Sequence, residues 1–238
     1  GYFYRVFEDG RISNGSACGN DVASEREMCA KYILESVLYW TEEYHIDGFR
    51  FDLMGLLDVN LMNRIRRELD ARYGKGEKIL FGEPWAAAET AMEGNAVPAL
   101  KKNIMLLDEN IGMFCDDTRD AVKGSALKIK RPGFINGASG KENDIVQSAR
   151  AWCATSCGST DEDSDSVTTV KAPSQVITYV SAHDNQTLWD KLAETLPEAD
   201  EAERMRLNRM AADIYMTCQG SLFFLSGEEF ARTKNGLE

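Results

Sequence analysis

The chain has 238 residues, 43% of them hydrophobic, which is enough apolar material for one large domain or two small ones. Its formal net charge of −12 would repel the phosphate backbone of a nucleic acid. The longest apolar run, SLFFLSG, is far shorter than the roughly 20 residues of a membrane-spanning helix, and the N-terminus has no signal-peptide pattern. We therefore expect neither nucleic acid nor a membrane as a partner. We expect the cytoplasm, with secretion left open because the native N-terminus is expected to lie upstream of Gly1.

The first predicted elements are a glycine- and asparagine-rich loop at 14–21 and a helix at about 25–44. Apolar residues recur through the second segment close to the 3.6-residue period of a helix. Ser24 and Glu27 have the S-x-x-E spacing of a capping box, which predicts that they satisfy backbone amides at the helix start.

Short apolar segments then alternate with amphipathic ones. A strand is predicted near 47–53, a helix from Asp58 to Gly74, a strand in KILFGEPW, a strand in IGMFC before a helix at 117–123, a strand in QVITYVSAHDN before helical segments at 187–193 and 199–218, and a last strand in SLFFLSGEEF. This alternation predicts the α/β class with a parallel sheet.

The cysteines, the histidines and one acidic tract show no convincing metal-binding pattern. No C-x-x-C pair is present, so we expect mostly buried free thiols, although Cys153 and Cys157 would be able to bridge if the protein is exported. The tract at 159–166 begins like an EF-hand loop, but Ser166 replaces its glycine and Ala172 its last glutamate. We expect a solvated acidic loop there.

Two charged residues interrupt the predicted strand in the segment HIDGFRFDLMG. Side chains alternate along a strand, so Phe49, Phe51 and Leu53 share one face. Arg50 and Asp52 share the other. In a parallel barrel that other face points toward the C-terminal mouth, where active sites lie. A buried Arg–Asp ion pair is the alternative interpretation.

Two further predicted strands also end in polar residues. Glu83 follows the apolar run of ILFGEPW, and His183 and Asp184 follow that of ITYVSAHDN. A parallel barrel would bring the C-terminal ends of all three strands around one mouth. The repeated pattern therefore predicts an active site.

The segments GFRFDLMG, FGEPW and VSAHDN resemble, in this order, the second, third and fourth conserved regions of the α-amylase superfamily, glycoside hydrolase family 13. The flanking segments YFYR, NGSACGNDVASER, HDNQTLWDK and FFLSGEEFARTKNG resemble type I pullulanases, which cleave α-1,6 links. The resemblance covers essentially the whole chain. It implies a partial (β/α)8 TIM barrel, approximately strands four to eight with their helices.

By the same resemblance, residues 1–238 are expected to be the C-terminal portion of a catalytic TIM-barrel domain. The family's first conserved region, its first three barrel strands, its N-terminal modules and its C-terminal β domain have no counterpart in the sequence. Five of eight strands cannot close a barrel, so we expect the chain by itself to be inactive.

The resemblance implies a role for each polar residue at the strand ends. Asp52 would be the nucleophile, Glu83 the general acid/base and Asp184 a third carboxylate that holds sugar hydroxyls. Arg50 would support the charge of Asp52, and His183 would bind the same sugar. A retaining glycosidase needs such a pair, one carboxylate ionised and one protonated, about 5 to 5.5 Å apart. We expect the arginine to lower the pKa of the nucleophile and a less polar site to keep the acid protonated.

Several other residues have two interpretations each. Trp85 would stack on a glucosyl ring or pack in the core. Asn185 would contact the sugar or serve as a turn residue. Asn20 and Asp21 would reach the substrate or belong to a loop held by its own hydrogen bonds. His45, at the N-terminal end of its strand, is expected to be structural.

The predicted function is hydrolysis of α-1,6-glucosidic links in pullulan and branched α-glucans, by double displacement through a glycosyl-Asp intermediate. One alternative is another α-amylase-family hydrolase or transglycosylase acting on α-1,4 links, with the same carboxylates. Another is an inactive fragment or a non-catalytic α-glucan-binding protein. The chemistry needs no cofactor beyond side chains and water. Calcium would be structural at most, and these residues assign no ligand set to it.

Overall fold

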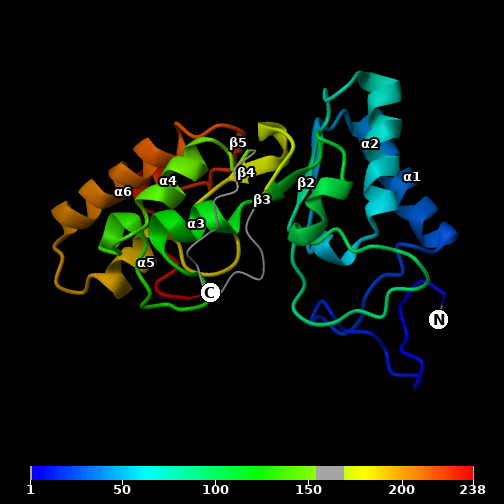
Figure 1. The fold of residues 1–238 in the computed structure, drawn as a ribbon, viewed down its shortest axis with the longest axis horizontal. Coiled ribbons are helices and arrows are strands. Elements are labelled where there is room, and N and C mark those ends of the chain that lie inside the picture. The colour runs from blue at the N-terminus through cyan, green and yellow to red at the C-terminus, as the bar shows by residue number, and fades with distance from the viewer. Residues whose placement is uncertain (1, 154–168, 238) are drawn as a thin grey trace. The chain divides into compact units, whose positions relative to one another are not determined.

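The computed structural model describes residues 2–153 and 169–237, so the acidic tract at 159–166 and Cys157 lie outside the described residues. The chain forms two compact units, Gly1–Phe114 and Cys115–Glu238 (Figure 1). Within the described ranges, no helix is long and apolar enough to cross a membrane.

The first unit contains parallel strands and two long helices that lie side by side (Figure 1). Its elements are α1 (Glu27–Tyr44), β1 (Gly48–Phe51), α2 (Val59–Tyr73), β2 (Ile79–Gly82) and β3 (Gly112–Phe114), with 3-10 turns at Met54–Leu56 and Lys101–Leu106. β1 pairs with β2, and β2 with β3, both in parallel. The helices bury an apolar stripe that includes Leu34 and Leu38 of α1 and Ile65 and Leu69 of α2.

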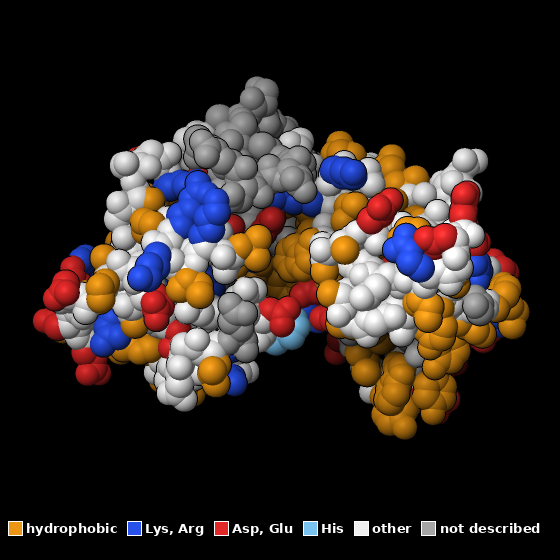
Figure 2. Space-filling view, turned by 90° about the horizontal axis from the view of Figure 1, so that it is seen from below, with side chains coloured by type: hydrophobic (Ala, Val, Ile, Leu, Met, Phe, Trp, Pro, Cys, Tyr) orange, Lys and Arg blue, Asp and Glu red, His pale blue; other side chains and the backbone are white. Residues whose placement is uncertain are grey.

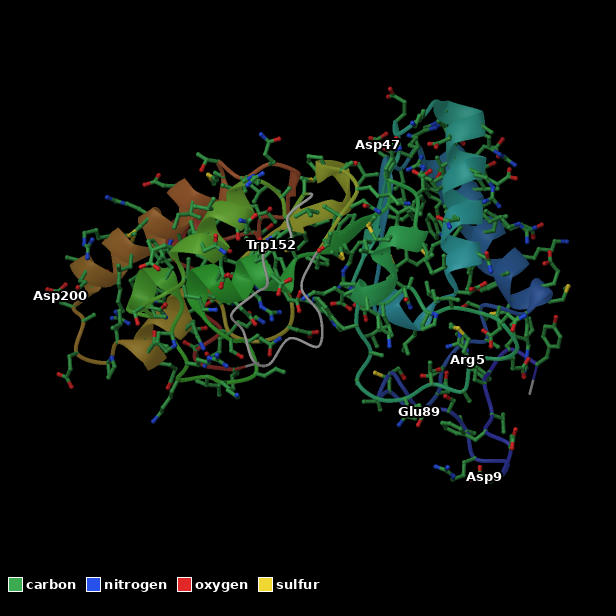
Figure 3. All side chains as sticks on the ribbon, in the orientation of Figure 1. Arg5, Asp9, Asp47, Glu89, Trp152 and Asp200 are labelled. Carbon is green, nitrogen blue, oxygen red and sulfur yellow. The ribbon has the colours of Figure 1, made fainter. Side chains whose placement is uncertain are left out.

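The second unit also joins parallel strands to helices. Its elements are α3 (Asp116–Lys123), α4 (Glu142–Ala149), β4 (Val176–Thr178), α5 (Leu188–Thr195), α6 (Glu201–Tyr215) and β5 (Ser221–Leu222), with 3-10 turns at Phe134–Asn136, Pro173–Gln175 and Glu228–Phe230. β4 and β5 pair in parallel. Trp152, labelled in Figure 3, is buried and donates its indole N–H to Thr118 Oγ1 at 2.9 Å.

The predicted βα alternation is confirmed, but the strands are shorter than predicted and α4 was not predicted. The strand expected at 47–53 ends at Phe51 because Leu53 turns into a left-handed conformation, with φ of 45°. All four residues of β1 are partly buried, on both faces of the strand. Two helix starts have true side-chain caps, Thr187 for α5 and Asp200 for α6.

The capping box predicted for Ser24 and Glu27 is wrong. α1 has no side-chain cap at its start. Ser24 is buried, and its hydroxyl accepts hydrogen bonds from the Asp58 amide at 2.9 Å and from Arg5 at 3.2 Å. Glu27 forms an ion pair with Arg64 of α2 at 3.1 Å. Partners distant in the sequence therefore replace the local motif.

The cysteines only partly follow the expectation of buried thiols. Cys29 and Cys115 are buried free thiols, and burial raises the pKa of Cys115 to about 12. Cys18 is exposed, whereas Cys153 and Cys218 are partly buried. The environment of the two buried thiols makes them unreactive at neutral pH.

Arg5, shown in Figure 3, is a buried cation that holds the N-terminal segment onto the rest of the first unit. Its guanidinium forms an ion pair with Glu25 at 2.7 Å. It also donates to the Leu56 carbonyl at 2.8 Å and to Thr90 Oγ1 at 2.9 Å. Three segments that are distant in the sequence are thus joined by one side chain.

Replacing Arg5 with methionine should strongly destabilise the protein. The change leaves the Glu25 carboxylate, only 7% exposed, without its cation, and breaking such a buried pair costs about 3–5 kcal/mol. Urea denaturation measures this loss. Arg11→Met is the matched control because the Arg11–Asp9 pair is exposed to solvent, and we expect no measurable effect there. Equal losses in the two variants would show that Arg5 does not have this role.

Lys123 is a buried cation in the second unit, and it should make stability depend on pH. Burial lowers its pKa to about 7, while its ammonium donates to the Gln186 carbonyl at 2.8 Å. An unfolded lysine keeps its proton up to about pH 10. Between about pH 7 and pH 10 the unfolded chain therefore binds more protons, and stability rises with pH.

We expect the free energy of unfolding to depend less steeply on pH in Lys123→Met than in the wild type. The lysine itself should contribute a rise of about 2 kcal/mol between about pH 7 and pH 9. Urea titrations across this range measure the difference. Lys130→Met changes an exposed lysine of the same unit and should keep the wild-type slope. An unchanged slope in Lys123→Met would contradict the prediction.

Candidate active site

One guanidinium joins two carboxylates at the ends of β1 and β2. Arg50 donates through Nη1 to Asp52 Oδ1, and through Nη2 to Glu83 Oε1 at 2.5 Å. The second oxygen of Glu83 accepts the Leu53 amide at 2.7 Å. The Asp52 side chain is 65% exposed, whereas that of Glu83 is only 5% exposed. An open carboxylate and an enclosed one thus share a cation.

The predicted contact between Arg50 and Asp52 is present, but the expectation of less polar surroundings for Glu83 is wrong. Although the Glu83 side chain is buried, a guanidinium and a backbone amide contact its two oxygens. The register explains the arrangement. Gly48 pairs with Ile79 and Phe51 with Gly82, so the next residues along, Asp52 and Glu83, leave the sheet together.

The turn after β1 packs directly on the chain after β2. Gly55 donates its amide to the Glu83 carbonyl at 2.8 Å. A Cβ at Gly55 would lie 2.4 Å from the Trp85 carbonyl oxygen, so only glycine allows this approach. Gly82 is similarly enclosed, because a Cβ there would lie 2.5 Å from that of Met54. The two glycines therefore allow the close approach of the two segments that carry the carboxylates.

Phe114 of β3 is a neighbour that the sequence analysis did not identify. The guanidinium carbon of Arg50 lies 5.6 Å from the centroid of its ring, within the range of a cation–π contact. Phe114 is itself buried and packs edge-on against Phe81, with ring centroids 5.5 Å apart. The only signal in the sequence was an aromatic residue at the end of a neighbouring predicted strand.

Asp21 organises the loop at 14–21. Its buried carboxylate accepts from Ser13 Oγ and the Gly15 amide, both at 2.7 Å, from Thr90 Oγ1 at 2.8 Å, and from the Ser16 amide at 2.9 Å. Burial would by itself raise the pKa of Asp21, but these hydrogen bonds outweigh it and lower that pKa. Asp21 therefore belongs to a loop held by its own hydrogen bonds, the second of its two interpretations.

The same loop is bound to the segment that follows Glu83. The Gly15 carbonyl accepts the amides of Ala87 and Ala88 at 2.8 and 3.0 Å. Asn20 is exposed, and its carbonyl accepts the Ser16 hydroxyl at 2.7 Å. For the side chain of Asn20, contact with the substrate and a role within the loop both stay predictions.

In the second unit, His183 and Asp184 lie together beyond β4. His183 Nε2 is 3.5 Å from Asp184 Oδ1, and their side chains are 54% and 68% exposed. Asn185 follows with φ of 60°, the left-handed conformation typical of a turn residue. Lys234 Nζ donates to the main-chain carbonyls of His183 and Asn185. Two exposed polar side chains are therefore presented on an anchored turn.

Trp85 and His45 are the other two candidate residues. Trp85 is partly buried, and its main chain packs against Gly55. His45 is exposed and ends α1 in a left-handed conformation with φ of 54°, in agreement with a structural role.

The structure thus brings the predicted residues together in two groups, one in each unit. The first contains Arg50, Asp52 and Glu83, and the second contains His183 and Asp184. That both groups act on one substrate stays a prediction.

Comparison with known proteins identifies the family. The model of the α-amylase catalytic domain matches residues 14–236. Pullulanase of Bacillus subtilis (strain 168) is 41% identical over 241 residues, which cover 100% of this chain and 31% of that protein. The chloroplastic pullulanase 1 of Arabidopsis thaliana is 30% identical and covers 99% of this chain and 28% of its own length.

Solved structures agree with this match. A mutant pullulanase of Paenibacillus barengoltzii, complexed with maltotetraose, has a TM-score of 0.88 and 40% identity, covering 100% of this chain and 35% of that chain. The type I pullulanase of Bacillus subtilis, complexed with maltose, has a TM-score of 0.85 and 39% identity, covering 100% of this chain and 32% of that one. The chain therefore spans about a third of the length of these relatives. It belongs to the α-amylase catalytic-domain family, and its fold is part of that family's (β/α)8 barrel.

Proposed function

We propose that the protein is a retaining glycoside hydrolase that cleaves α-1,6-glucosidic links in pullulan and branched α-glucans. The observation that carries the proposal is the Arg50 guanidinium, which contacts both the Asp52 and the Glu83 carboxylate. The similarity of the chain to pullulanases, some of which were solved with bound maltooligosaccharides, supports an α-glucan as the substrate. The site residues fit the two carboxylates that double displacement requires.

In the first step Asp52 attacks the anomeric carbon, and Glu83 gives its proton to the departing glycosidic oxygen. In the second step Glu83 takes a proton from water, and the water oxygen displaces Asp52 from the glycosyl intermediate. The greater exposure of Asp52 suits attack on an incoming sugar, and Glu83, at the end of the neighbouring strand, supplies the second carboxylate that double displacement requires. No cofactor or calcium ion enters either step.

Arg50 balances charge through both steps. Before attack, Asp52 is the anion beside the guanidinium and Glu83 is protonated. In the glycosyl intermediate Asp52 is a neutral ester, while Glu83 has lost its proton and is the anion. Because the guanidinium contacts both groups, it has one anionic partner in each state. Moving the negative charge from one carboxylate to the other therefore leaves no unpaired cation.

The acid/base assignment predicts different losses on different substrates. Glu83→Gln should slow hydrolysis of pullulan by about 100-fold or more, yet slow a substrate with an activated leaving group far less, because such a group needs little protonation. Asp52→Asn should abolish the glycosyl intermediate on both. Steady-state rates on the two substrates measure this difference.

Glu89→Gln is the matched control for this experiment, because it makes the same change at an exposed glutamate, labelled in Figure 3. It should leave both rates as they are in the wild type. Equal losses on the two substrates in Glu83→Gln would remove Glu83 from the acid role.

The proposed link specificity predicts faster hydrolysis of pullulan than of linear amylose. The chain is assayed alone and together with a segment that supplies the remaining barrel strands, as a fusion or as a separate chain. A barrel of this type has eight strands, and the described residues supply five. We therefore expect little activity from the chain alone and rates on the order of 1 to 1000 per second once the barrel is complete.

Two results would change this proposal. A completed barrel that prefers amylose would favour an α-1,4-acting hydrolase or transglycosylase. A completed barrel that binds α-glucan without cleaving it would favour a binding protein.

A further inference from the structure

Lys234 contacts the turn that carries Asp184, although the two residues are far apart in the sequence. Its ammonium donates to the carbonyl of His183 and, at 2.7 Å, to that of Asn185. These two carbonyls belong to the residues on either side of Asp184. An ammonium has three donors, so one side chain is able to hold both carbonyls at once.

The backbone of Lys234 is itself anchored to α5. Asp190, which is buried in the first turn of that helix, accepts the Lys234 amide at 2.7 Å and the Thr233 hydroxyl at 2.5 Å. The start of α5 is capped by Thr187, whose hydroxyl accepts the Asp190 amide at 3.2 Å. Because α5 directly follows the turn, these contacts close a ring from the turn to the helix, to Lys234 and back to the turn.

The turn has a conformation that benefits from such support. Asn185 has φ of 60°, which residues other than glycine adopt at some energetic cost. The Asp184 side chain is 68% exposed and lies 3.5 Å from His183 Nε2, so the backbone of the turn, which carries both residues, sets the place and the direction from which it projects. Partial burial lowers the pKa of Lys234, but the nearby Asp184 carboxylate acts in the opposite direction and favours the charged ammonium. Hydrogen bonds from a charged donor are stronger than those from a neutral one.

We propose that Lys234 is a positioning residue, which fixes the turn at 183–185 and thereby the direction in which Asp184 is presented to an α-glucan. The proposal rests on the proposed function, and it extends the candidate site to a residue that makes no direct contact with the reacting groups. Asp190 is part of the same arrangement because it fixes the main chain of Lys234.

The experiment compares Lys234→Met with the wild type by two independent readouts. Methionine keeps an unbranched side chain of similar length but donates no hydrogen bond. Amide hydrogen exchange, followed by mass spectrometry on the peptide that spans 183–187, should become faster in the variant. In the completed barrel, kcat/KM on pullulan should fall by about tenfold to a hundredfold, as expected when a group that binds substrate is misplaced.

Lys130→Met is the matched control, since it makes the same change at an exposed lysine of the same unit. It should change neither readout. Asp190→Asn is a second test of the anchor and should speed exchange in the same peptide. Lys234→Arg keeps a charged donor and should recover part of the loss in kcat/KM.

Two results would overturn the proposal. One is unchanged exchange at 183–187 in Lys234→Met, because the turn would then not depend on the lysine. The other is faster exchange with wild-type kcat/KM, because the turn would then not position a catalytically important group. A wild type that neither binds nor cleaves α-glucan would refute the proposed function, and with it this role, but that failure appears before any substitution is made.

Discussion

The candidate site of the first unit depends on the Arg50 guanidinium, which is held between two carboxylates and an aromatic ring. Without it, Asp52 and Glu83 would be two anions at the ends of neighbouring parallel strands, and like charges in such proximity oppose each other's ionisation. Phe114 limits the positions that the guanidinium occupies. The strand pairing, the two glycines and the turn at Leu53 all fix the positions of these three charged groups.

Much of the surrounding structure holds charged or hydrogen-bonding groups away from water, and it does so with partners remote in the sequence. Arg5, Asp21 and Lys123 are buried, and each binds groups from other segments of its own unit. Such contacts fix loops that have little apolar surface of their own. Hydrophobic side chains, by contrast, also remain on the surface of the first unit, as Figure 2 shows in orange on the right. Tyr32 and Tyr39 of α1 are examples.

The order of strands and helices, and the strand ends that carry Asp52, Glu83 and Asp184, could be predicted because periodicity and local polarity are visible in the sequence. The end of β1 could not be predicted, because it depends on a contact distant in the sequence. The Leu53 amide donates to the Glu83 carboxylate, 30 positions further along the chain. The predicted cap at Ser24 was wrong for the same reason, because the Ser24 hydroxyl accepts the backbone amide of Asp58 and not an amide of the helix.

The pairing of Gly48 with Ile79 has a consequence for how the gene can vary. Side chains alternate across a strand, so inserting or deleting one residue between positions 79 and 83 would turn the glutamate to the opposite face of the sheet. The same event in the segment after Trp85 would leave that alternation intact. Natural length variation among homologues should therefore be absent from the first interval and concentrated in the second, whatever substitutions either of them accepts.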